Sequence, residues 1–76
     1  MVDVDKLRGV LAEKRLSVAS ISEKIGVDKA TFYRKLNGNG DNFTIREADA
    51  ISRELNLNKN EAVSIFFNQF VSKMRF

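Results

Sequence analysis

The sequence predicts an all-α fold of five short helices, and three observations lead to that prediction. The 76 residues contain no proline, the residue that most strongly interrupts helices. No segment shows the sustained alternation of apolar and polar residues that is typical of a half-buried strand. The one glycine-rich stretch, residues 37–40, separates segments in which apolar residues recur at helical spacing. Helices joined by short turns explain this pattern most simply.

The first helix is expected over about residues 4–15. Its apolar residues recur at helical spacing from Val4 to Leu11. Asp3 or Asp5 supplies the acidic residue that suits a helix N-terminus. The amphipathic pattern indicates a helix that buries one face, so we assign this segment to the scaffold of the domain.

Two further helices are predicted on either side of a tight turn at Gly26. The first spans residues 18–25, with Ser17 as its N-cap. The second spans residues 29–36, with Asp28 as its N-cap, and it ends before the glycine-rich stretch. Glycine suits the left-handed backbone conformation that ends a helix, so the two helices should follow each other closely.

Capping boxes predict the starts of the last two helices. In residues 44–47 and again in residues 58–61, each end of the box carries a side chain that can satisfy a free backbone amide at the other end. The helices that follow are expected over about residues 45–55 and 59–72. The final segment is unusually apolar for the end of a small domain.

The composition argues against several classes of protein. Cysteine and histidine are both absent, which removes disulfides, thiolate metal sites and the commonest general base. We therefore expect neither an enzyme nor a bound metal, cofactor or small molecule. No apolar run approaches the ~20 residues of a membrane span, and the amino terminus is acidic where a signal peptide would be basic. The expectation is a single cytoplasmic domain over residues 1–76.

Positive charge gathers in the third predicted helix. The formal net charge of +3 would by itself be ordinary for a soluble domain. However, Lys29, Arg34 and Lys35 fall within one short stretch, whereas the acidic residues are scattered. A solvated helix face is the plain explanation of such a cluster. Two short helices joined by a glycine-containing turn, the second of them basic, favour instead a helix-turn-helix that reads DNA.

The segment Leu16–Gly38 resembles the lambda-repressor-like family of phage repressors and Cro proteins, of the Cro and CI type. Residues 43–51 and 65–67 are also similar to small regulators of temperate phages of Gram-positive bacteria. The resemblance covers nearly the whole chain and implies a compact five-helix domain with its helix-turn-helix at the second and third helices. It further implies a sequence-specific transcriptional regulator that binds double-stranded operator DNA at the nucleoid of a bacterial host.

The resemblance also implies which residues contact DNA. Members of the family read base edges with the first residues of the third helix and with those one turn later, and an asparagine at the end of that helix holds a phosphate. The base-reading residues implied here are Lys29, Ala30, Tyr33 and Arg34, and Thr31 is a further candidate in one rotation of the helix. The implied phosphate contacts, which set register without reading sequence, are Ser17, Asn37, Asn39 and Asn42. Arg34 is the leading candidate, because arginine can donate paired hydrogen bonds to guanine.

Two departures from the family pattern bear on this assignment. Val18 stands where the family often has a glutamine that touches phosphate, so that contact is expected to be missing. Lys35 followed by Leu36 stands where an apolar residue is usual at the earlier of the two positions. The second departure leaves two rotations of the third helix open.

The two rotations differ in which side chain reaches the groove. In the first, Phe32 and Leu36 define the buried side. Thr31 then turns towards DNA at the expense of Tyr33, which becomes an aromatic at the edge of the core. In the second, the stem of Lys35 lies inward and Tyr33 regains the groove. Arg34 faces outward in both rotations.

The apolar carboxyl-terminal segment has two interpretations. Part of it must close the core, but a single helix face cannot hide all of its apolar residues. We expect the surplus to form a partner interface, which we assign to Phe67, Phe70, Val71 and Met74. The partner would be a second copy in a homodimer, or another regulator. The latter gives the alternative function of a protein-interaction module or anti-repressor; basic residues there are too few for a membrane anchor.

Overall fold

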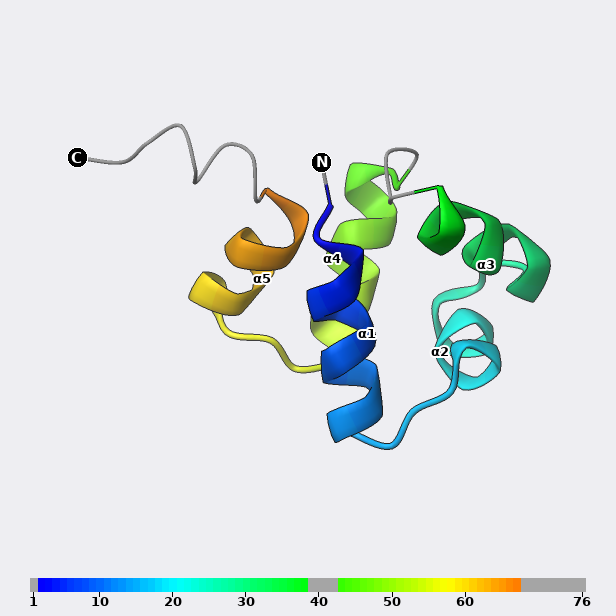
Figure 1. Ribbon diagram of the computed structural model, residues 1–76, viewed down its shortest axis with the longest axis horizontal. Helices are drawn as coiled ribbons and strands as arrows, with labels where there is room; N and C mark the ends of the chain where they lie inside the picture. The colour runs from blue at the N-terminus through cyan, green and yellow to red at the C-terminus, as the bar shows by residue number, and fades with distance from the viewer. Residues whose placement is uncertain (1, 39–42, 68–76) are drawn as a thin grey trace.

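The structure is a computed structural model that describes residues 2–38 and 43–67. Within these residues the chain forms five α-helices and no strand (Figure 1), so the predicted all-α class is confirmed. The helices are α1 (Val4–Glu13), α2 (Val18–Ile25), α3 (Lys29–Asn37), α4 (Ile45–Glu54) and α5 (Lys59–Phe66). None of the helices described is long and apolar enough to cross a membrane.

A side chain caps the first turn of each of these helices. The capping residues, each of which accepts a hydrogen bond from a backbone N–H of its helix, are Asp3, Ser17, Asp28, Thr44 and Asn58. The two capping boxes predicted ahead of α4 and α5 are both formed. At α1, where two aspartates were candidates, Asp3 is the cap. The starts of the helices therefore follow from local side-chain chemistry.

Three helices end in the same kind of backbone turn, in which one residue adopts the left-handed conformation. These residues are Arg15 after α1, Gly26 after α2 and Asn56 after α4, with φ of 58°, 75° and 53°. In each turn two backbone N–H groups donate back to carbonyls in the last turn of the helix. Because Arg15 reverses the chain, α1 ends at Glu13 and not near residue 15 as the sequence predicts.

The last described helix, α5, ends at Phe66. The backbone of Phe67 leaves the helical conformation, with φ −126° and ψ 36°. The helix predicted to reach about residue 72 therefore does not continue through Phe67. Residues 68–72 of that prediction lie outside the described part of the chain.

One apolar core takes side chains from all five helices. Phe32 of α3 is completely buried, and its ring meets Phe43 edge to face with the centroids 5.6 Å apart. Phe43 in turn meets Phe66 of α5 at 6.4 Å. This row of three rings joins α3, the residue before the α4 cap, and α5. The buried apolar residues are Val2, Leu7, Leu11, Ile21, Phe32, Leu36, Ile51, Leu55, Ile65 and Phe66.

The helices form two groups around α4 (Figure 1). α1 packs against α5 on one side, and α2 packs against α3 and α4 on the other. Residues 2–3 form an N-terminal strap across the first group: Val2 is buried, and the Asp3 N–H donates to the Ile65 carbonyl at 2.7 Å. Lys6 Nζ also donates to Ser64 Oγ. Asp3 and Lys6 are thereby bonded to α5.

Two glycines should respond in opposite directions to alanine. A Cβ added at Gly9 or at Gly26 would meet no atom within 4 Å, so neither substitution causes a clash. Gly9 lies inside α1, where alanine should raise the free energy of unfolding by about 0.5–1 kcal/mol. Gly26 has a left-handed backbone, so alanine there should lower it by about 1–2 kcal/mol. Denaturant unfolding measures both changes, and a stabilising Gly26→Ala would contradict the turn.

Candidate nucleic-acid interface

α2 and α3 form a helix-turn-helix, because only three residues separate them. Gly26 reverses the chain with its left-handed backbone. Asp28 then starts α3 at once, since its carboxylate accepts hydrogen bonds from the N–H groups of Ala30 and Thr31 at 3.0 and 3.3 Å. α2 packs against both α3 and α4. The turn and α3 are therefore held firmly on the body of the domain.

The rotation of α3 decides which of its side chains face outward. Phe32 is fully buried, and Leu36 is 2 % exposed. Lys35 is half-buried as well. The two rotations left open by the sequence differ in whether Phe32 and Leu36 or the stem of Lys35 lies inward. In the structure all three side chains lie on the buried side of α3. In this rotation Tyr33 is 44 % exposed and Thr31 is half-buried.

The outward strip of α3 carries most of the residues that the resemblance implies for DNA contact. Its exposed members are Lys29, Ala30, Tyr33, Arg34 and Asn37. The Thr31 hydroxyl, beside this strip, accepts a hydrogen bond from the Arg34 guanidinium at 3.3 Å. Because the two residues lie one turn apart, this contact lays the guanidinium along the helix. Contact of these residues with bases stays a prediction.

The residues implied as phosphate contacts are described in part. Ser17 is exposed at the start of α2, where its hydroxyl accepts from a backbone N–H of that helix at 3.0 Å. Asn37 is exposed at the end of α3, where its Oδ1 accepts from Arg8 Nη2 at 3.1 Å. The other two, Asn39 and Asn42, lie outside the described residues.

Arg8 is the residue near this strip that the sequence does not single out. It is exposed on α1 and meets Asn37 only because the folded chain brings these two residues, 29 positions apart in sequence, close together. Its one sequence signal is a place on the polar face of an amphipathic helix, which other charged residues share. The contact could not be derived from spacing.

Lys35 is tied to α4 and does not belong to the outward strip. Its Nζ lies 2.6 Å from both carboxylate oxygens of Glu47, and each of the two side chains is 15 % exposed. The same Nζ lies 5.9 Å from the centroid of the Phe43 ring. Glu47 Oε1 also accepts from the Thr44 N–H at 2.8 Å and so completes the capping box. Because of this Lys35–Glu47 tie, only Lys29 and Arg34 of the predicted basic cluster are exposed.

The surroundings of Glu47 keep its carboxylate ionised. Burial alone would raise the pKa of Glu47, but hydrogen bonds from the Lys35 side chain and the Thr44 backbone, together with the Lys35 charge, lower it overall. The tie is therefore complete at neutral pH.

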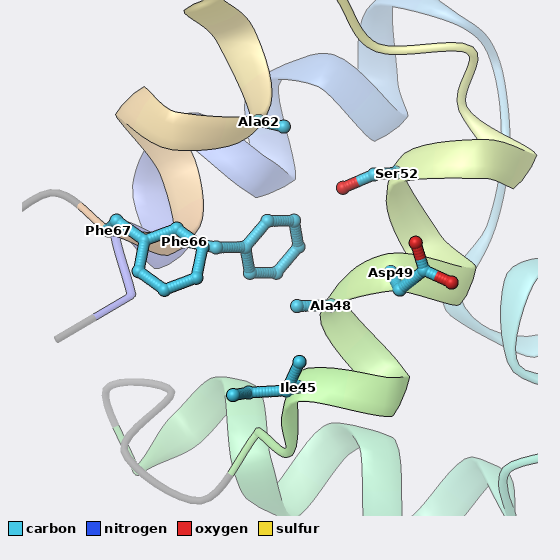
Figure 2. Close-up of a pocket in the computed structure, with 7 residues that line it drawn as sticks. All are labelled: Ile45, Ala48, Asp49, Ser52, Ala62, Phe66 and Phe67. Atoms are coloured by element: carbon cyan, nitrogen blue, oxygen red, sulfur yellow. The ribbon is translucent and has the colours of Figure 1, made fainter. Parts of the chain in front are cut away.

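An apolar groove lies between α4 and α5 (Figure 2). The Phe66 ring points into the space between the two helices, and Ile45 and Phe67 line the groove while remaining 78 % and 46 % exposed. Its volume of about 260 Å³ is below the ~300–1,000 Å³ usual for small-molecule sites. Phe67 belongs to the predicted partner interface; its other members, Phe70, Val71 and Met74, lie outside the described residues.

A family model described as a Cro/C1-type HTH DNA-binding domain matches residues 6–66. No curated protein and no solved structure matches the chain. The matched range begins inside α1 and runs to the end of α5, so it includes both the helix-turn-helix and the Lys35–Glu47 tie.

Glu47→Gln should separate the two roles of this side chain, because glutamine can complete a capping box but carries no charge. Loss of the ion pair should lower the free energy of unfolding by about 1–2 kcal/mol at neutral pH. The pKa of Glu47 in the folded state lies below its ordinary value of 4.5. The ion pair therefore contributes its full stabilisation above pH 4.5. This stabilisation is lost as the pH falls through the folded-state pKa. Denaturant unfolding from neutral pH to about pH 3 should show wild type and variant converging.

The matched control for this prediction is Asp49→Asn. It removes the ion pair between Asp49 and Arg53, whose side chains are 60 % and 80 % exposed respectively. Such a pair contributes less than about 0.5 kcal/mol, so the control should lose little stability. A difference between wild type and Glu47→Gln that persists in acid would contradict the charge-based role of Glu47.

Proposed function

The chain belongs to the Cro/C1-type HTH DNA-binding domain family, which confirms the resemblance seen in the sequence, and from this premise we propose that it regulates transcription by binding specific operator DNA. The observation that carries the proposal is the outward strip of α3, with Arg34 exposed on a helix anchored from behind by Phe32. A helix held in this way fits the roughly 12 Å wide major groove. The family relationship favours a Cro-like or repressor-like role at a phage promoter.

Base reading centres on Arg34. Its guanidinium has five N–H donors, and the contact with Thr31 uses one nitrogen at a long 3.3 Å, so donors remain for the O6 and N7 of a guanine. Ala30 is small enough to meet a thymine methyl group, and Lys29 can donate to a guanine. Tyr33 lies exposed beside them. These neighbours would set the preference for the flanking base pairs.

Phosphate contacts would fix the register of α3 on the duplex. Ser17 lies at the start of α2, where backbone N–H groups and the helix dipole favour an anion. Asn37 lies at the other end of the helix-turn-helix, at the end of α3. Asn39 and Asn42 are proposed for the same role. A phosphate at each end would hold α3 across the groove.

Arg34→Ala should lower affinity for a selected duplex by about 1–3 kcal/mol, or about 5- to 150-fold, and relax the preference at one base pair. Arg53→Ala removes the same charge from an 80 % exposed side chain of α4, and it should leave base preference unchanged. Selection of bound sites from a random DNA library, followed by titration, measures both effects. A folded Arg34→Ala with wild-type affinity and preference would refute the base-reading role.

We further propose that two copies bind the two half-sites of a palindromic operator as a homodimer. Ile45 and Phe67 are large apolar side chains that stay exposed beside the groove of Figure 2, and such clustering marks contact surfaces. The interface would also include Phe70, Val71 and Met74. Half-sites about 34 Å apart would multiply the affinity of a module this small.

The same groove supports a second candidate function, that of a protein-interaction module or anti-repressor. Ile45 and Phe67 would then contact another regulator in place of a second copy. The two functions differ in their dependence on α3: a chain that works as an anti-repressor would keep its activity when Lys29 and Arg34 are both replaced by alanine.

Ile45→Ser and Phe67→Ser should each raise the dimer Kd by about tenfold, as the loss of a buried apolar contact at an interface requires. Sedimentation over a range of concentrations measures the shift. Tyr33→Ser is the matched control, because Tyr33 has a similar exposure of 44 % but lies on α3. A wild-type chain that stays monomeric at high concentration, both free and on DNA, would contradict the homodimer.

A further inference from the structure

A side-chain hydrogen bond joins α1 to the end of α3. Arg8 Nη2 donates to Asn37 Oδ1 at 3.1 Å, across a sequence separation of 29. Both side chains are exposed. An exposed polar pair adds little to folding stability. The main consequence of this contact is the orientation of the polar groups that Arg8 and Asn37 expose to solvent.

The hydrogen bond decides which end of the Asn37 amide faces away from the protein. A guanidinium can only donate, whereas a side-chain amide has one accepting end and one donating end. Asn37 must therefore turn Oδ1 towards Arg8, and the two N–H donors of Nδ2 are directed to the other side. The orientation of the amide follows from the chemistry of its partner.

Arg8 also brings a positive charge to this place. The contact with Asn37 engages one of its guanidinium nitrogens, so most of its five N–H donors and its full charge are available to a ligand. Oriented amide donors beside a free guanidinium are complementary to an oxygen that both accepts hydrogen bonds and carries negative charge. A phosphate of the DNA backbone has these properties.

We propose that Arg8 and Asn37 form a clamp for one backbone phosphate. Arg8 orients the Asn37 amide so that it donates to the phosphate, and the Arg8 charge acts on the same group. This inference rests on the DNA binding proposed above and extends the interface from α2 and α3 to α1. The clamp strengthens binding to every sequence equally, because phosphates are the same in all of them. It therefore differs from Arg34, whose effect depends on the base pair.

The test uses the full chain and a mixed-sequence duplex of about 20 base pairs, long enough for two half-sites. Arg8→Ala and Asn37→Ala should each lower affinity by about 5- to 30-fold. Arg8→Ala should also reduce the slope of log affinity against log salt by about 0.9, as the loss of one neutralised phosphate requires. The double variant should bind only slightly more weakly than Arg8→Ala, because an unoriented amide contributes little.

Two further variants make the test specific. Arg8→Lys keeps the charge but not the planar fork, so it should restore the salt slope and only part of the affinity. Arg53→Ala removes a charge from an exposed side chain of α4 and should leave the salt slope unchanged. Thermal unfolding of each variant verifies that the fold is retained.

Three results would overturn the clamp. These are a fully additive loss in the double variant, an unchanged salt slope for Arg8→Ala, and wild-type affinity for Arg8→Ala. If Arg8→Ala binds as wild type while Arg34→Ala loses its base preference, the clamp fails and the reading of DNA by α3 stands. If the wild-type chain binds neither this duplex nor any member of a random library, the proposed function fails and the clamp fails with it.

Discussion

The burial of Phe32 is the constraint on which the rest of the structure depends. Its ring is completely enclosed and meets Phe43, which in turn meets Phe66. Through Phe43, the Phe32 ring thus connects α3 to α5. Successive helix residues are about 100° apart, and any other residue at the centre of the core would turn a different set of side chains outward. The exposure of Tyr33 and Arg34 on α3 is thus a consequence of core packing.

The Lys35–Glu47 tie fixes α3 from the polar side as Phe32 fixes it from the apolar side. Glu47 caps the start of α4 and pairs with Lys35, so the beginning of one helix and the orientation of another depend on a single carboxylate. Drawing both charges out of water has a desolvation cost, which the two 2.6 Å contacts and the Thr44 N–H offset. The tie also removes one cation from the exposed surface, so the outward strip is less basic than the sequence suggests.

Local chemistry determined what could be predicted from the sequence. The starts of α4 and α5 could be predicted at Thr44 and Asn58, because a capping box lies within four consecutive residues. The end of α1 could not, because Arg15 adopts a left-handed backbone that glycine would normally signal. The contacts of Arg8 and Lys35 depend on how helices pack together, and no spacing along the chain contains that information. The outward position of Arg34 was therefore predictable, whereas the exposure of Tyr33 and the contacts that support the site were not.

The N-terminal strap determines where an attached group would leave the domain. Val2 is buried and the Asp3 N–H is bonded to the Ile65 carbonyl, so the chain enters the fold beside α5, in the group of helices opposite α2 and α3 (Figure 1). A fluorophore or surface anchor placed ahead of Val2 would emerge next to α5 and leave α3 open to solvent. A group attached there would lie on the side of the domain that does not carry the helix-turn-helix.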